Sequence, residues 1–217
     1  MGCLLKANGL YSRMSVGAVL LAAGAGSRLG RRPKPLLELG GVPLVMRQLV
    51  ALSGAGVDEL VVVLGHHADP IEAALGAFPI TLVRNPSPDM GRASSVRVGL
   101  DALSPRVDAI LVALADQPLI DAQDITTLIG AFKKRGDADM VVPRVDGEPG
   151  NPVIFDAALR DSAAAGGCRR WREQHPGRVC WLDTDNRRYR VDIDTPEDLV
   201  RFALDTGHEL QWPAALR

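Results

Sequence analysis

The sequence predicts an α/β protein in which a mostly parallel sheet carries helices on both faces. Short apolar runs recur along the chain, and stretches with helical periodicity separate them. The run at 109–115 is apolar throughout, which is typical of a strand buried on both faces of a parallel sheet. Such an alternation requires crossover connections, which are right-handed in nearly all known folds, and ligands then bind at the carboxyl ends of the strands.

The individual elements follow from local patterns. The first strand is an unbroken apolar run, and the first helix carries an apolar stripe that includes Leu44, Leu49 and Leu52. Near the end, Thr195 and Pro196 followed by two acidic residues are typical of a helix start. The expected strands are 16–21, 58–64, 80–84, 109–115 and 138–143, and the expected helices are 43–52, 68–75, 91–103 and 121–134.

Length and composition indicate one domain. The chain has 217 residues, 47% of them hydrophobic, which is enough for a sizeable core. We expect a disordered leader or an upstream start at 1–14, the domain at 15–207 and a C-terminal tail at 208–217. A net charge of −1 argues against nucleic-acid binding, and no apolar run is long enough to span a membrane. The three cysteines form no C-x-x-C pair, so a reducing cytoplasm is expected.

The segment after the first strand predicts a phosphate site. The strand ends at Gly24-Ala-Gly26, and basic residues follow, among them Arg28 and Lys34. Glycines let the backbone N–H groups approach an anion, and the cations would hold its charge. A solvated turn and a dinucleotide fingerprint are the alternatives. The dinucleotide pattern G-x-G-x-x-G fails at Leu29, and the strand at 58–64 is followed by Gly-His-His rather than a ribose-binding carboxylate.

The stretch LAAGAGSRLGRRPKPLLELGGVPL resembles the signature of the nucleotidyltransferases of the sugar-nucleotide and molybdenum-cofactor type. Within that superfamily the chain looks most like the molybdenum cofactor cytidylyltransferases. The resemblance implies the Rossmann-like sheet of the nucleotide-diphospho-sugar transferases and a loop that wraps a nucleoside triphosphate. It implies catalytic roles for Arg28 and Lys34. The implied nucleotide-binding residues are Leu21, Ala22, Ala23, Gly24, Gly26, Ser27, Lys34, Gly91, Ser95 and Asp116.

Acidic residues supply a candidate magnesium site. Asp116 follows the apolar run at 109–115, where ligands of a parallel sheet bind, although an Asp there can also cap a turn. Asp192 and Asp194 are two residues apart and would project to one face of a strand. The resemblance implies that Asp116 binds the magnesium ion and that Asp192 is a second ligand, with Asp194 as a further candidate.

Two more segments concern the substrates. In the family that the chain resembles, Gly91 and Ser95 match a segment that borders the base, and Ala23 is typical of the cytidylyl-type enzymes, so CTP is favoured over GTP. The resemblance places the acceptor beside Gly150 and Asn151, and beside Gly167 and Arg169. At this second pair the sequence departs from the family pattern, because Ala165 replaces an Asp and Cys168 replaces a smaller residue.

The implied activity is a magnesium-dependent transfer of CMP from CTP to the terminal phosphate of a molybdopterin-type pterin, with release of pyrophosphate. A molybdoenzyme client is an additional expected partner. Three alternatives stay open. One is a cytidylyl- or guanylyltransferase acting on a sugar phosphate or a phospho-acid, and another is an NAD(P)-dependent oxidoreductase. The third is a non-catalytic chaperone that binds the molybdenum cofactor.

Overall fold

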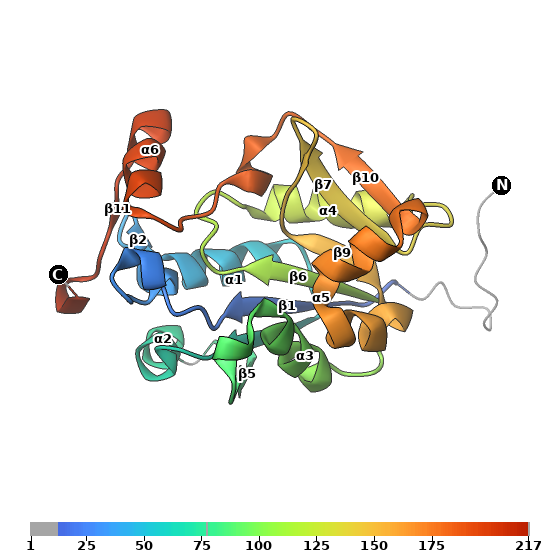
Figure 1. Ribbon diagram of the computed structural model, residues 1–217, viewed down its shortest axis with the longest axis horizontal. Coiled ribbons are helices and arrows are strands. Elements are labelled where there is room, and N and C mark those ends of the chain that lie inside the picture. The colour runs from blue at the N-terminus through green and yellow to red at the C-terminus, as the bar shows by residue number, and fades with distance from the viewer. Residues whose placement is uncertain (1–12, 77, 217) are drawn as a thin grey trace.

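A computed structural model describes residues 13–76 and 78–216. The leader expected at 1–14 therefore lies almost entirely outside the described residues. The main sheet has eight strands in the order β10-β7-β9-β6-β1-β4-β5, with β8 paired to β7 (Figure 1). Its strands are β1 (Val16–Ala22), β4 (Glu59–Leu64), β5 (Thr81–Arg84), β6 (Ala109–Leu114), β7 (Met140–Val145), β8 (Glu148–Pro149), β9 (Val153–Asp156) and β10 (Val179–Asp183).

Most of the neighbouring strands are parallel, as predicted. β1 lies between β4 and β6 and pairs with both in parallel, and β4 pairs with β5 and β7 with β10 in the same way. The exceptions are β8, which pairs antiparallel with β7, and β9, which runs antiparallel between β6 and β7. Its apolar run, 153–155, indicates a strand, but nothing in the sequence reveals its direction or its neighbours.

Helices cover both faces of the sheet, which confirms the predicted architecture (Figure 1). Ala18 and Leu20 of β1 face α1, α2 and α4, whereas Val19 between them faces α3 and α5. α3 packs closely on the sheet at Gly99, where an added Cβ would lie 2.3 Å from a methyl group of Val19. The helices are α1 (Leu44–Gly54), α2 (Ala68–Leu75), α3 (Arg92–Ala102), α4 (Ala122–Lys133), α5 (Arg160–Gln174) and α6 (Pro196–Thr206).

A small second sheet extends the end of the molecule that carries α6 (Figure 1). It consists of β2 (Glu38–Leu39), β3 (Val42–Pro43) and β11 (Leu210–Gln211), and β11 pairs antiparallel with β2. Phe202 of α6 and Ile193 belong to the apolar cluster at this end. The C-terminal segment thus lies against the residues that follow the glycine-rich loop.

Of two local predictions near the end of the chain, the structure confirms the helix start at Thr195 and contradicts the strand around Asp192. α6 begins as predicted, because the Thr195 side chain accepts a hydrogen bond from the backbone N–H of Asp198 and the Asp198 carboxylate accepts one in return. Asp192 and Asp194, in contrast, do not lie on a strand. Their segment is irregular because it leaves the sheet and makes a single backbone bond to the segment after β6, from Ile193 N to Asp116 O at 3.1 Å.

None of the helices in the described ranges is long and apolar enough to cross a membrane.

Candidate active site

The glycine-rich loop turns sharply after β1. Gly26 has φ +61°, and its carbonyl oxygen accepts hydrogen bonds from the N–H groups of Leu29 at 2.9 Å and Arg31 at 3.0 Å. A Cβ on Gly26 would lie 2.1 Å from the backbone oxygen of Arg32, so the turn requires glycine at this position. At Gly24 an added Cβ would meet nothing within 4 Å, since this glycine faces open space.

A cavity of about 490 Å³ lies between this loop, the end of β6 and the start of α3. Nine of the residues predicted to bind a nucleotide line it, and so does Arg28. Gly26 is the predicted residue that does not line the cavity; its carbonyl oxygen instead closes the turn. Arg92 also lines the cavity and was not predicted as a site residue, although it follows Gly91 directly and is the basic residue at that helix start. The lining residues are Leu21, Ala22, Ala23, Gly24, Ser27, Arg28, Lys34, Pro35, Pro88, Gly91, Arg92, Ser95, Leu114, Ala115 and Asp116.

Lys34 lies at the centre of a charged cluster beside this cavity. Its ammonium group donates to Asp116 Oδ2 at 2.5 Å and to Asp194 Oδ1 at 2.7 Å. Arg28 donates to the other oxygen of Asp194 at 2.7 Å. The Lys34 and Asp116 side chains are only 12% and 16% exposed, so water screens this pair weakly. The structure thereby brings together both residues predicted to be catalytic and two of the predicted metal ligands.

The pKa values follow from these contacts. Burial is the largest influence on Lys34 and lowers its pKa, but the charges and hydrogen bonds of Asp116 and Asp194 outweigh it, so the pKa lies above its usual value. Burial likewise opposes the ionised form of Asp194, yet Lys34 and Arg28 hold its pKa below the usual range. The pKa of Asp192 is raised, first by burial and then by the like charges of Asp116 and Asp194. An additional cation beside Asp192 would therefore stabilise its ionised form.

The carboxylates around Lys34 form a candidate site for a magnesium ion. Among residues 13–76 and 78–216, no three His, Cys, Asp or Glu side chains are arranged to hold a metal ion by themselves. Magnesium, however, is usually held by one or two carboxylates together with substrate phosphates. Asp116 Oδ1 is buried and has no hydrogen-bond partner among the described residues, which leaves an oxygen for such an ion. The residues therefore fit a magnesium ion that binds together with a nucleotide.

Gln117, which was not predicted as a site residue, links the Asp116 segment to the segments that carry Asn151 and Tyr189. It is 1% exposed, and its amide nitrogen donates to the carbonyl oxygens of Tyr189 at 3.1 Å and Asn151 at 3.3 Å. The backbone carbonyl oxygen of Gln117 accepts a hydrogen bond from the Gln48 side chain at 2.6 Å. The residue beside Asp116 is thus fixed to the segment that leads to Asp192 and to the turn that carries Asn151.

Ser95 is oriented by a buried amide. Asn85, which is 5% exposed, donates from its side chain to the hydroxyls of Ser94 at 2.8 Å and Ser95 at 2.9 Å. Ser94 donates in turn to the carbonyl oxygen of Gly91 at 2.8 Å. Because Ser95 accepts from Asn85 and lines the cavity, its hydroxyl hydrogen is directed away from Asn85.

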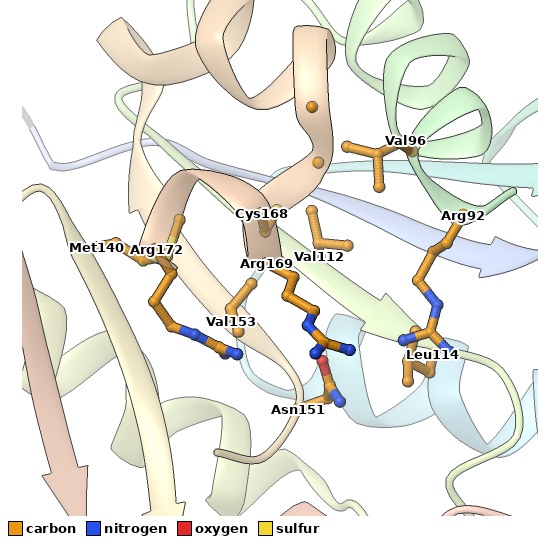
Figure 2. Close-up of a pocket in the computed structure, with 13 residues that line it drawn as sticks. Arg92, Val96, Val112, Leu114, Met140, Asn151, Val153, Cys168, Arg169 and Arg172 are labelled. Carbon is orange, nitrogen blue, oxygen red and sulfur yellow. The ribbon is translucent and has the colours of Figure 1, made fainter. Parts of the chain in front are cut away.

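A second cavity, of about 410 Å³, adjoins the first, and Arg92 and Leu114 line both (Figure 2). Three of the four residues predicted to contact the acceptor line it, namely Asn151, Gly167 and Arg169. Gly150 does not, because it is packed against Tyr189, whose backbone oxygen would lie 2.7 Å from an added Cβ. Gly167, with φ +77° and ψ +159°, interrupts the helical backbone of α5 and places the following turn beside the cavity.

The fold and these two cavities define an α/β protein whose ligand sites lie side by side at the carboxyl edge of a mostly parallel sheet. The chain belongs to the MobA-like NTP transferase family, because the family model of that domain matches residues 18–180, most of the chain. The family predicted from the glycine-rich loop is thereby confirmed at this level.

A curated relative and several solved structures extend the comparison. The chain is 35% identical over 197 residues to the nicotine blue oxidoreductase of Paenarthrobacter nicotinovorans, covering 86% of this chain and 96% of that protein. It resembles the crystal structure of Rv0371c from Mycobacterium tuberculosis H37Rv with TM-score 0.75 and 29% identity, over 88% of this chain and 98% of the other. A second structure of Rv0371c is a complex with manganese, with TM-score 0.72 and 26% identity, over 89% and 100% of the two chains. A nucleotidyl transferase from Methanothermobacter thermautotrophicus gives TM-score 0.71 and 27% identity, over 87% and 95%.

Proposed function

We propose that the protein transfers CMP from CTP to the terminal phosphate of a molybdopterin-type pterin and releases pyrophosphate. The observation that carries this proposal is the junction of the two cavities at Arg92 and Leu114. A nucleotide in one cavity and an acceptor in the other would meet at this junction, which is the requirement for direct group transfer. Membership of the NTP transferase family supports the reaction class.

In this proposal the backbone around Gly24 cradles the triphosphate, and Arg28 and Lys34 stabilise the charge that develops on the α-phosphate. The acceptor phosphate attacks the α-phosphorus, a new P–O bond forms, and pyrophosphate leaves with the electrons of the broken P–O bond. Because a phosphate is already ionised near neutral pH, no general base is needed. The chain contributes alignment and charge, and loss of one such charge typically costs on the order of a hundredfold in rate.

Asp116 and Asp192, with Asp194 as a further candidate, would hold the magnesium ion in this proposal. The bound ion would supply positive charge to the phosphates of the nucleotide. The buried, unpartnered oxygen of Asp116 and the raised pKa of Asp192 support these assignments. Lys34 already neutralises part of the negative charge of Asp116 and Asp194, so Lys34 and the ion would together balance these two carboxylates.

The choice of CTP rests on Ala23, which lines the first cavity and is typical of the cytidylyl-type loop. Ser95 is part of the same proposal, because its hydroxyl is free to donate toward a base carbonyl while it accepts from Asn85. The proposal includes a cytoplasmic setting and a molybdoenzyme that receives the product.

The test is pyrophosphate release from CTP in the presence of magnesium and molybdopterin. We expect turnover with the wild-type protein and with Asp101→Ala, an exposed acidic residue outside both cavities. Asp116→Ala should lose at least about a hundredfold of the rate. Turnover with a sugar phosphate but not with the pterin would show that the acceptor is a sugar phosphate. Equal rates for Asp116→Ala and the wild-type protein would contradict the proposed role of Asp116.

An oxidoreductase is the second candidate, because the nicotine blue oxidoreductase aligns along 96% of its own length. The end of β4 argues against an NAD(P) site, because Leu64 is followed by Gly65 and two histidines rather than by a ribose-binding carboxylate. Titration with NADPH separates the two candidates. Binding of NADPH with no binding of CTP would favour the oxidoreductase.

A further inference from the structure

The charged side chains that line the second cavity are all positive. Its floor is apolar and consists of side chains from β6, β7, β9 and α3, including Val96, Val112, Met140 and Val153. Three arginines surround this floor, and no Asp or Glu is among the residues described as lining it. A cavity of this kind suits a ligand with an apolar body and negative charge at its ends.

Arg172 is the least exposed of the three arginines in this cavity. It is half-buried, and within the described part of the chain it makes no ion pair and no hydrogen bond; its guanidinium lies 5.9 Å from the centre of the Trp181 ring. Burial lowers its pKa, the charge of the neighbouring Glu173 opposes this effect, and the charge of Arg169 adds to it, so that the pKa lies below its usual value. Arg169 differs, because it is exposed and bonds Glu173 at 2.9 Å. An anion beside Arg172 would therefore supply hydrogen bonds that the described residues do not provide.

Arg92 lies at the opposite side of the cavity. Figure 2 shows Arg92 projecting from α3 on one side and Arg172 projecting from α5 on the other, with Val112, Val153 and Arg169 between them. Arg92 lines both cavities, is exposed, and has no ion pair within the described ranges. It is therefore the cation at the junction with the nucleotide cavity, and Arg172 is the cation at the far end.

We propose that the second cavity binds an acceptor with two anionic groups on an apolar body, one group at Arg92 and the other at Arg172. This inference rests on the proposed function for the identity of the first group, the phosphate that attacks the nucleotide. Arg172 then determines specificity, since it selects acceptors with a second negative charge and makes no contact with the reacting phosphorus. A bidentate guanidinium contact accounts for such selection, because its planar fork matches carboxylate, phosphate and sulfonate oxygens.

The probes are naphthalene-2,6-disulfonate and naphthalene-2-sulfonate, which share an apolar body and differ by one charge. Their binding to the full chain is measured by isothermal titration, with tryptophan fluorescence as a second readout because Trp181 lies beside Arg172. The wild-type protein should bind the disulfonate roughly tenfold or more tightly than the monosulfonate, the gain that a charge-assisted contact provides.

Arg172→Met keeps the aliphatic bulk and removes the charge, so both probes should bind it with nearly equal affinity. Arg172→Lys should restore part of the preference. Arg170→Met is the matched control, because Arg170 is an exposed neighbour on α5 that does not line the cavity, and it should keep the full preference. Thermal unfolding of each variant establishes that it is folded at the temperature of the titration.

No preference for the disulfonate in the wild-type protein, or a preference that survives in Arg172→Met, would overturn the proposal. The probes require neither CTP nor turnover. If the preference depends on Arg172 but no nucleotide binds, the proposed function fails while the dianion site stands. If CTP is turned over but the preference is absent, the proposed function stands and the dianion site fails.

Discussion

Removal of the Lys34 charge should weaken the fold measurably, because two carboxylates depend on it. The Lys34 ammonium lies 2.5 Å from Asp116 and 2.7 Å from Asp194. At an effective dielectric constant of about 20, each contact has a gross Coulomb energy of roughly 6 kcal/mol, most of which offsets the loss of hydration. Breaking a buried pair on one side typically costs about 3–5 kcal/mol. Asp194 is 32% exposed, so we expect about 3 kcal/mol for Lys34→Met.

Urea unfolding followed by circular dichroism at pH 7 measures this cost. Lys133→Met is the matched control, because Lys133 is an exposed lysine on α4 with no ion pair among the described residues, and its change should stay within about 0.5 kcal/mol. In Lys34→Met combined with Asp116→Asn, the loss should be at least about 0.5 kcal/mol smaller than the sum of the two single losses. A loss below about 1 kcal/mol for Lys34→Met, or simple additivity in the double variant, would refute the account of this cluster.

Four further substitutions test the surroundings of the site by the same unfolding measurement. Gly26→Ala should cost at least about 2 kcal/mol, because φ is +61° and a Cβ would collide with the backbone oxygen of Arg32, whereas Gly24→Ala should leave stability nearly unchanged. Equal costs for the two glycines would contradict this explanation. Asp121→Ala removes the N-cap of α4 and should cost about 1 kcal/mol at pH 7. Burial raises the pKa of Asp121, but hydrogen bonds and a nearby arginine outweigh it, so the pKa is lowered and this cost should shrink as the pH falls below 3.8; a cost that grows there would be inconsistent. Gln117→Met should cost about 1–2 kcal/mol because the two hydrogen bonds from its side chain to the carbonyl oxygens of Tyr189 and Asn151 are lost, and an unchanged midpoint would disprove the linking role of this side chain.

The first part of the sheet is predictable from the sequence because its elements have strong local patterns. Each expected strand and helix between 16 and 143 lies within two residues of an observed element at each end. β6 is an example, because its residues are buried on both faces and its sequence is apolar throughout. Local pattern and tertiary environment agree in these elements, which is the condition under which such predictions succeed.

The second part of the fold depends on contacts that the sequence does not reveal. α5 was not predicted, since its segment is rich in Ala, Gly and Arg, lacks a clear apolar stripe and is interrupted at Gly167. The insertion of β9 between β6 and β7 depends on pairing across the sheet. The segment around Asp192 looks like a strand by its alternation, but it leaves the sheet, where no neighbouring strand pairs with it.

Some residues of the candidate site can likewise be predicted from the sequence, and others cannot. Gly24 and Asp116 can be found because they follow closely on two buried strands, and the carboxyl ends of adjacent parallel strands meet at one edge. Lys34 can be found because it belongs to the basic residues that follow the glycine-rich turn. Gln117 and Arg172 could not be found, because their importance comes from burial and from partners far away in the chain. Nothing in the local sequence distinguishes Arg172 from the other arginines around it.

Isothermal titration of CTP, with and without magnesium, tests the central claim most directly. We expect magnesium-dependent binding of CTP to the wild-type protein, weaker binding of GTP, and loss of the magnesium dependence in Asp116→Ala, with Asp101→Ala unchanged. Binding of NADPH without binding of CTP would contradict the claim. The glycine-rich loop would then have to be interpreted as a dinucleotide site.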